Sequence, residues 1–316
     1  MRQYLVHSDN AVEAVLRGLT ATSPVAIQRV GSHSGVVYSG NTRRRTKILT
    51  GGGSGHEPLF LGAVGPGMAD AAVAGQIFAA PNPESILATI EALQAEAGVI
   101  LLYGNYSGDV LNFGFAGEEA QQKGIQVAEI RVHDDIASAP LSKQTERRGI
   151  AGDIFVLKCT GAAADRGDSF TEVIRLGEKA NHHTRSLGVA LRAASSIDTG
   201  KPMFELPFGQ LEIGMGLHGE IGVQRSAFEP AETLVPRMID LLHSDLTSSG
   251  LTSRRAAVLI NGLGSTTILE LLAVAGYTRD ALDRAGIEAA YFTPVNLRRH
   301  LIWLAFRSPG WRSMQI

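Results

Sequence analysis

The chain has 316 residues, which fits roughly two domains of about 150 residues each. Its 29 lysine and arginine residues against 31 aspartate and glutamate residues leave a net charge of −2. Charge therefore gives no reason to expect a nucleic acid or an anionic membrane as partner. The single cysteine, Cys159, excludes an internal disulfide framework and any metal site built on several thiolates.

Secretion and membrane insertion are not indicated. Residues 1–10 lack a basic region followed by a long apolar core, so they do not have the pattern of a signal peptide. No apolar run approaches the roughly 18–20 residues that a membrane helix needs. We therefore expect a cytoplasmic protein with no membrane partner. Glycine is the compositional outlier, because 36 of 316 residues are about 11%, against a typical value of about 7%.

The first half of the chain alternates short aliphatic runs with longer amphipathic ones. The runs typical of short buried strands are residues 47–50, 99–103, 127–132 and 154–157. Apolar residues at three- and four-residue spacing predict a helix over 83–97, which Pro83-Glu84 opens well. A later helix is predicted to run from Val173 toward His183. This alternation indicates an α/β layered fold with a largely parallel sheet.

The pattern starts again after about residue 185. Residues 187–191 and 256–260 predict strands, and residues 234–242 and 267–275 predict helices. A glycine-rich stretch lies at 214–220. We therefore expect two α/β layered domains with mostly parallel or mixed sheets, an N-terminal one of residues 1–185 and a C-terminal one of residues 186–316.

A glycine-rich segment directly after the first predicted strand is a candidate ligand site. Residues 51–55 contain four glycines and Ser54, and His56 follows. Glycines let the backbone approach a small ligand and adopt positive φ. The alternatives are a tight turn whose Ser54 caps a helix, or a generic phosphate loop. It is not a Walker A loop, because no Gly-Lys-Ser/Thr follows.

A second candidate segment, residues 104–109, follows the predicted strand 99–103. Ligands of parallel α/β sheets bind beyond the carboxyl ends of the strands, so we expect this segment and the first to face one crevice. Asp109 is a candidate general base there. The alternative is an aspartate that caps the following helix.

The third candidate segment is Met215-Gly216-Leu217-His218-Gly219-Glu220. A histidine between glycines can act as a nucleophile, a base or a single ligand. The alternative is a structural histidine in a turn. The other histidines show no metal-ligand spacing, so we expect no metal site.

Taken together, these three segments resemble the dihydroxyacetone kinase family, specifically its K subunit, which binds the substrate. The resemblance covers most of the chain and also runs through residues 147–149, 161–169 and 261–264. It implies a two-domain α/β protein, usually a homodimer, that binds dihydroxyacetone covalently.

The resemblance also implies roles for single residues. In the family, the histidine that matches His218 adds its imidazole nitrogen to the substrate ketone and forms a hemiaminal. The aspartate that matches Asp109 is the base for the hydroxyl to be phosphorylated, and the histidine that matches His56 hydrogen-bonds the substrate. A hemiaminal requires a carbonyl, so glycerol is refused. The expected substrate-binding residues are Gly53, Ser54, Gly55, His56, Gly104, Asp109 and His218.

A complete kinase needs more than this chain offers. The sequence has no aspartate cluster suited to Mg-nucleotide, and no helical nucleotide domain follows the K-like region. The resemblance implies that the phosphoryl donor sits on a separate L subunit that binds ADP or ATP with Mg. In many bacteria a phosphotransferase-system protein recharges that subunit. We therefore expect no cofactor on this chain and catalysis that depends on a partner.

The chain departs from the family at two places. The family usually has lysine where this chain has Gly104, which predicts a larger, neutral pocket and a larger ketose, for example the tetrulose erythrulose. At the end of the chain, residues 292–296 replace a family segment, and no acidic residue follows Glu288. Codons allowed for residues 300–316, read out of phase, can spell the missing Ala-Gly-Phe-Ser-Leu-Thr. Our hypothesis is that the last 20 or so residues come from a frameshift.

Two other functions remain open. One is a non-enzymatic ketose sensor or co-activator on the same scaffold, which binds its ligand through His218 and contacts a transcription regulator. The other is an inactive remnant of such a protein, which Gly104 and the altered tail favour. The presence of both His56 and Asp109 favours the kinase, because a sensor needs the hemiaminal but not the general base.

Overall fold

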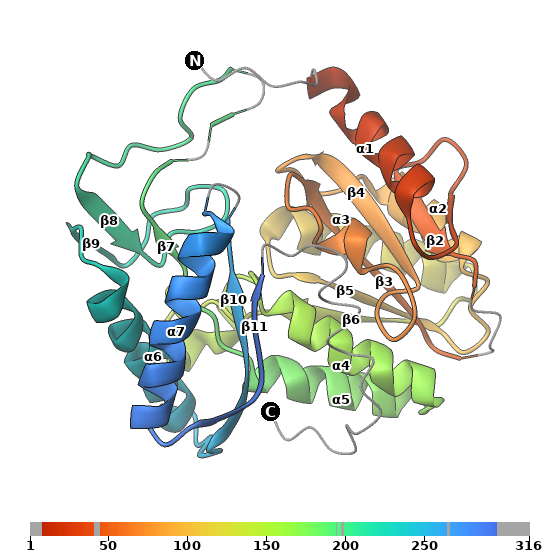
Figure 1. Ribbon diagram of the computed structural model, residues 1–316. Helices are drawn as coiled ribbons and strands as arrows, with labels where there is room; N and C mark the ends of the chain where they lie inside the picture. Colours follow the sequence, from red (N-terminus) through yellow and green to blue (C-terminus); the bar gives the residue numbers. More distant parts are fainter. Residues whose placement is uncertain (1–7, 41–44, 194, 197–198, 264–265, 296–316) are drawn as a thin grey trace. The chain divides into compact units, whose positions relative to one another are not determined.

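The computed structural model describes residues 8–40, 45–193, 195–196, 199–263 and 266–295 (Figure 1). The hypothesis about the tail falls mostly on residues 296–316, which lie outside this set. The chain forms two compact units. The first unit takes its described residues from Met1–Asp134, Arg148–His182 and Ala194–Phe204, and the second from Asp135–Arg147, His183–Ala193 and Glu205–Ile316.

The first unit is built on a six-stranded sheet in the order β1-β2-β4-β3-β5-β6. Its strands are β1 (Ile27–Arg29), β2 (Gly35–Tyr38), β3 (Lys47–Ser54), β4 (Ala71–Ile77), β5 (Val99–Gly104) and β6 (Val127–Val132). Strands β4, β3, β5 and β6 are parallel, whereas β1 and β2 run antiparallel to their neighbours. The expected α/β fold with a mostly parallel sheet is therefore confirmed.

Helices cover both faces of this sheet. They are α1 (Ser8–Thr22), α2 (Pro83–Ala92), α3 (Ser107–Gln122), α4 (Asp153–Arg166) and α5 (Phe170–His183), and the unit also contains the 3₁₀ turn η1 (Phe60–Ala63). A second 3₁₀ turn, η2 (Leu141–Glu146), belongs to the second unit. Helix α2 begins as predicted, because the Asn82 side chain accepts a hydrogen bond from the backbone N–H of Ser85 and Pro83 occupies the first turn. Figure 1 shows α4 and α5 running side by side.

Strand β5, which lies between β3 and β6, is buried along its whole length because both of its faces are covered. Leu101 belongs to a core cluster with Phe113 of α3. Its neighbour Leu102 points to the opposite face, together with Ile130 of β6. On that face a Cβ atom at Gly177 of α5 would lie 2.5 Å from Cδ1 of Ile130, so α5 approaches the sheet closely.

Two local predictions for this unit were wrong. Residues 154–157 form the first turn of α4 rather than a strand. All four of these residues are apolar and buried, and a short unbroken apolar run does not distinguish a buried helix from a buried strand. The glycine-rich segment does not follow its strand but belongs to it, since β3 extends to Ser54.

The second unit contains two small sheets. Strands β7 (Val189–Ala190), β8 (Gln210–Ile213) and β9 (Gln224–Ala227) are antiparallel, and β10 (Arg255–Asn261) and β11 (Glu288–Val295) are parallel. Helices α6 (Ala231–Ser248) and α7 (Ile268–Arg284) complete it. Thr267 and Glu270 form a capping box that fixes the start of α7, close to where the sequence predicts it. The strand predicted over 187–191 shortens to two residues.

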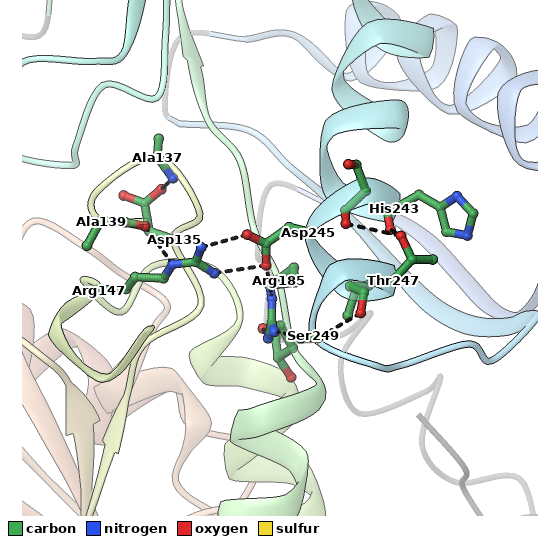
Figure 2. Close-up of polar contacts among 12 residues, drawn as sticks. Asp135, Ala137, Ala139, Arg147, Arg185, His243, Asp245, Thr247 and Ser249 are labelled. Carbon is green, nitrogen blue, oxygen red and sulfur yellow. Dashed lines mark hydrogen bonds and ion pairs between the residues drawn. The ribbon is translucent and has the colours of Figure 1, made fainter. Parts of the chain in front are cut away.

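Two buried arginines tie parts of the second unit together through one carboxylate (Figure 2). Asp245 of α6 accepts hydrogen bonds from Nη1 and Nη2 of Arg147 at 3.0 and 2.6 Å, and from Nε of Arg185 at 2.5 Å. Arg147 also donates from Nε to the carbonyl of Ala139, and Arg185 donates to Oγ of Ser249. The residue that ends η2, the segment after α5 and helix α6 are thus joined at Asp245.

No helix in the described part of the chain is long and apolar enough to cross a lipid bilayer.

Candidate active site

The glycines of β3 are required by the packing of the chain itself. A Cβ atom at Gly52 would lie 2.3 Å from the ring of Phe60, and one at Gly53 would lie 2.7 Å from the backbone nitrogen of Ala79. Gly55 has φ +101°, a left-handed conformation that favours glycine. Close approach between chain segments therefore accounts for these glycines without a ligand.

The hydroxyl of Ser54 is directed into the sheet. It donates a hydrogen bond of 2.7 Å to the carbonyl of Gly75, and its own carbonyl accepts from the backbone N–H of Phe78. Ser54 is 5% exposed and lies in β3, so it does not cap a helix. Its side chain fixes the end of β3 against the end of β4.

The imidazole of His56 lies beside two aromatic rings. Its ring centroid is 5.3 Å from that of Phe78 and 6.3 Å from that of Phe60, the latter in an edge-on arrangement. Both phenylalanines have positive φ, 56° for Phe78 and 60° for Phe60. Non-glycine residues in this region cost about 1–3 kcal/mol each and cluster at functional sites. The local backbone is thus held in an unusual conformation around His56.

Gly104 and Asp109 stand at the carboxyl end of the neighbouring strand. Gly104 is the last residue of β5, and Asp109 lies in the first turn of α3, whose N-cap is Tyr106. Asp109 is therefore not the cap of this helix. A Cβ atom at Gly104 would contact the carbonyl oxygen of Gly149 at 3.2 Å and Oδ2 of Asp153 at 3.4 Å.

Two further buried carboxyl groups lie near this strand end. Asp134 follows β6 and accepts hydrogen bonds from the backbone N–H groups of Ile150 and Gly152 at 2.8 and 2.9 Å. Asp153 begins α4 and is 3% exposed. Burial raises the pKa of Asp153 well above its usual range, and the charges of Asp134 and Asp109 raise it further. Among the described residues, no group of three or more histidine, cysteine, aspartate or glutamate side chains is arranged to hold a metal ion.

His218 lies in a glycine turn of the second unit. Gly219 has φ +88°, and the backbone N–H of Gly216 donates to the carbonyl of Glu220. The Glu220 carboxylate receives two hydrogen bonds from His218, from its backbone N–H at 2.9 Å and from Nδ1 at 3.2 Å. Partial burial acts to raise the pKa of Glu220, but the hydrogen bonds from His218 outweigh it and lower this pKa to about 2.

This pairing fixes which imidazole nitrogen carries the proton. An ionised carboxylate only accepts hydrogen bonds, so Nδ1 of His218 must carry a proton to bond to it. In the neutral ring, Nε2 then keeps its lone pair. The side chain of His218 is 25% exposed, which leaves part of the ring open to solvent.

The predicted site residues fall into two groups. Gly53, Ser54, Gly55, His56, Gly104 and Asp109 belong to the first unit, at the carboxyl ends of β3 and β5, which pair in parallel. His218 belongs to the second unit. Sequence reasoning missed Glu220, Asp134 and Asp153 as site residues. Glu220 had a signal, an acidic residue two positions after a histidine, and Asp134 had another, since it follows a strand of the parallel sheet.

The comparison with known families decides the relationship. A family model described as the Dak1 domain matches residues 17–295. The chain belongs to the Dak1 domain family. The resemblance to the dihydroxyacetone kinase family and its K subunit is thereby confirmed, and relatives named as dihydroxyacetone-binding subunits support it.

Two relatives show what this Dak1 protein is similar to. It is 39% identical over 272 residues to the dihydroxyacetone-binding subunit DhaK of a PTS-dependent dihydroxyacetone kinase 2 from Listeria innocua, covering 85% of this chain and 81% of that one. It is 42% identical over 248 residues to a D-erythrulose kinase from Mycolicibacterium smegmatis, covering 78% of this chain and 42% of that protein. This chain thus spans less than half of that kinase.

A solved structure shares the fold of the Dak1 protein. It is described as the dihydroxyacetone kinase operon co-activator Dha-DhaQ, with a TM-score of 0.83 and 31% identity. The match covers 88% of this chain and 85% of that one. The Dak1 scaffold therefore occurs both in kinases for small ketoses and in a protein described as a co-activator.

Proposed function

We propose that this chain is the ketose-binding subunit of a dihydroxyacetone-type kinase, which holds its substrate as a hemiaminal on His218. The observation that carries the proposal is the pairing of His218 with the Glu220 carboxylate, because it leaves Nε2 with a lone pair. The sequence identity of 39% to a dihydroxyacetone-binding subunit, over most of both chains, supports this class of substrate.

Capture of the ketose follows from this pairing. Nε2 of His218 attacks the carbonyl carbon, a C–N bond forms and the π electron pair moves to the carbonyl oxygen. The ring passes through a positively charged state, which the Glu220 carboxylate stabilises. The oxygen finally carries the proton that Nδ1 gives up, so the adduct is neutral. An alcohol without a carbonyl, such as glycerol, cannot undergo this step.

Asp109 serves the phosphoryl transfer. Its carboxylate takes the proton of the substrate hydroxyl while that oxygen bonds to phosphorus and the P–O bond of the donor breaks, the electron pair leaving with the donor. His56 hydrogen-bonds the ketose, and the backbone of Gly53, Ser54 and Gly55 lines the pocket. The donor is a Mg-nucleotide on a separate L subunit, which a phosphotransferase protein recharges. This chain acts as a homodimer in the cytoplasm.

A second candidate substrate is erythrulose. Gly104 leaves the strand end without a side chain, and the relative named D-erythrulose kinase is 42% identical to this chain. A tetrulose has one carbon and one hydroxyl more than dihydroxyacetone, so a larger pocket favours it. A third candidate is a ketose-sensing co-activator, which the structural match to the co-activator supports.

The test is the intact mass of the protein after incubation with dihydroxyacetone, erythrulose or glycerol, with borohydride as a trap. We expect an adduct with one or both ketoses, none with glycerol, and none in His218→Ala. Because hemiaminals reverse, a crystal soaked with the ketose provides a second readout. An adduct that survives His218→Ala would overturn the proposal. Adding an L subunit with nucleotide then separates a kinase, which turns the ketose over, from a co-activator, which does not.

A further inference from the structure

Asp153 carries a buried carboxyl group that forms no ion pair with any described residue of the first unit. The residue is 3% exposed, and its Oδ1 has no hydrogen-bond partner in the described part of the chain. A Cβ atom at Gly149 would lie 2.9 Å from this Oδ1, and one at Gly104 would lie 3.4 Å from Oδ2. Both oxygens therefore face the glycine backbone at the carboxyl end of β5.

An ionised carboxylate is expensive in such a place. Burying an unpaired ion costs at least several kcal/mol, and the usual outcome in proteins is that the group neutralises. The protonated acid avoids this cost. It also gives Asp153 one hydrogen-bond donor, which a carboxylate lacks.

Asp134 provides an internal contrast. It is fully buried, yet both of its oxygens accept backbone N–H groups, from Ile150 and Gly152. Such bonds favour the ionised form of a carboxyl group. The surroundings of these two buried aspartates thus differ: those of Asp134 favour the ionised form, and those of Asp153 favour the protonated form.

The charges around Asp153 act in the same direction. Asp134 at the end of β6 and Asp109 in the first turn of α3 are both acidic, and with burial they raise the pKa of Asp153. The N-terminus of α4, to which Asp153 itself belongs, acts in the opposite direction as a positive dipole end. Burial outweighs that dipole.

We propose that Asp153 is a positioning residue of the phosphoryl-acceptor site, a buried carboxylic acid that keeps its proton throughout the reaction and leaves Asp109 to take the proton of the substrate. This inference rests on the proposed function in its second part, the role toward Asp109. Its first part, the retained proton, concerns this chain alone.

The retained proton matters because phosphoryl transfer brings another anion to the site. The transferred group carries negative charge on its oxygens. An ionised Asp153 would add a third carboxylate beside Asp109 and Asp134 and would repel the incoming group. A protonated Asp153 fills the same space without that repulsion.

The first test needs neither ketose nor donor. We expect infrared titration to show the carbonyl band of a protonated carboxyl group in the wild-type protein at neutral pH, and Asp153→Asn to remove it. Should Asp153→Asn fold poorly, Asp153→Ser is the second variant. A wild-type protein without this band at neutral pH, or a band that survives both substitutions, overturns the proposal.

Stability against pH gives a second, independent readout. Because the folded pKa of Asp153 is raised, its contribution to stability is complete below the usual aspartate pKa and is lost as pH rises toward the folded value. The unfolding constant of the wild type relative to Asp153→Asn should therefore rise up to about tenfold per pH unit in that interval. Asp134→Asn is the matched control and should destabilise the protein at neutral pH. Identical pH dependence in wild type and Asp153→Asn contradicts the proposal.

The role toward Asp109 is tested by turnover with a competent L subunit. We expect the kcat ratio of wild type to Asp153→Asn to follow the infrared band at every pH, and to fall where the band is lost. A kcat ratio that does not change with pH when the infrared band does overturns the positioning role. If the band and the stability behave as expected but no ketose adduct forms on His218, the proposed function fails while the retained proton stands.

Discussion

Glu220 receives two hydrogen bonds from His218, its neighbour two positions earlier, one from the backbone N–H at 2.9 Å and one from Nδ1 at 3.2 Å. The pair closes a small ring within the glycine turn, so the orientation of the imidazole is set locally. Because the pKa of Glu220 is lowered to about 2, the carboxylate stays charged throughout the neutral range. The acceptor that directs the imidazole is therefore present at any working pH.

Replacing Glu220 by glutamine should weaken ketose capture. The amide keeps the shape of the side chain but removes the charge that holds the proton on Nδ1. A hydrogen bond to a charged group contributes about 1.5–3 kcal/mol, so we expect affinity for the ketose to fall about 10- to 150-fold. Ketose titration followed by calorimetry measures this. Glu229→Gln, at a surface ion pair with Arg237 of the same unit, is the control. Equal affinity in Glu220→Gln and wild type would contradict the role of Glu220.

Asp109→Asn should separate capture from turnover. The adduct forms on His218, so its mass should appear in the variant as in the wild type. The hydroxyl of the substrate loses its base, and we expect kcat with a competent L subunit to fall by about 10²- to 10⁴-fold. Asp168→Asn, at an ion pair with Arg166 on the surface of the same unit, is the control. Normal turnover by Asp109→Asn would show that another group is the base.

Gly104→Lys should shift the choice between ketoses. A Cβ atom at this position would meet its neighbours at 3.2–3.4 Å, so the backbone accepts a side chain with shifts of a few tenths of an ångström. The lysine occupies space at the strand end, and we expect kcat/KM for erythrulose to fall about tenfold relative to dihydroxyacetone. Gly18→Lys on α1, where a Cβ atom has nothing within 4 Å, controls for the added charge. Equal binding and turnover of both ketoses by Gly104→Lys would count against a pocket tuned for the tetrulose.

The fold class was predictable because hydrophobic periodicity reflects which faces are buried. The helix that starts at Pro83 and the strand that ends at Asn261 show the expected periods and boundary residues. Residues 154–157 were mispredicted because the buried start of α4 has no polar face to reveal a helical period. Local sequence cannot resolve such a segment.

The site was predictable only where its chemistry is local in sequence. His218 stands out because glycines lie near it on both sides in the sequence. Glu220 is only two residues away, so the same motif could have indicated it as a partner of His218. Asp153 gives no such signal, because what distinguishes it is contact with Gly104 and Gly149 and the absence of a partner for Oδ1 among the described residues. Those relationships depend on tertiary structure. The glycines of β3 were predicted to approach a ligand, yet the ring of Phe60 alone leaves no room for a side chain at Gly52.

Asp245→Ala should destabilise the second unit strongly. Arg147 and Arg185 are each 1% exposed at the side chain, and Asp245 is the carboxylate between them (Figure 2). Its removal leaves two buried guanidinium groups without this carboxylate, and breaking a buried pair in this way costs about 3–5 kcal/mol. Chemical denaturation of the variant against wild type measures the loss.

A matched control is available at the surface of α5. Glu172 and Arg175 form an exposed ion pair, so Glu172→Ala should change the stability far less than Asp245→Ala does. The pH dependence of the wild type gives a further check. Although burial acts to raise the pKa of Asp245, hydrogen bonds from Arg147 and Arg185 lower it overall. The stability it contributes is therefore complete above the usual aspartate pKa and is lost as pH falls through the lower folded value. If Asp245→Ala unfolds at the same denaturant concentration as Glu172→Ala, the two arginines do not depend on Asp245, and other acceptors such as the carbonyl of Ala139 and the hydroxyl of Ser249 suffice to hold them.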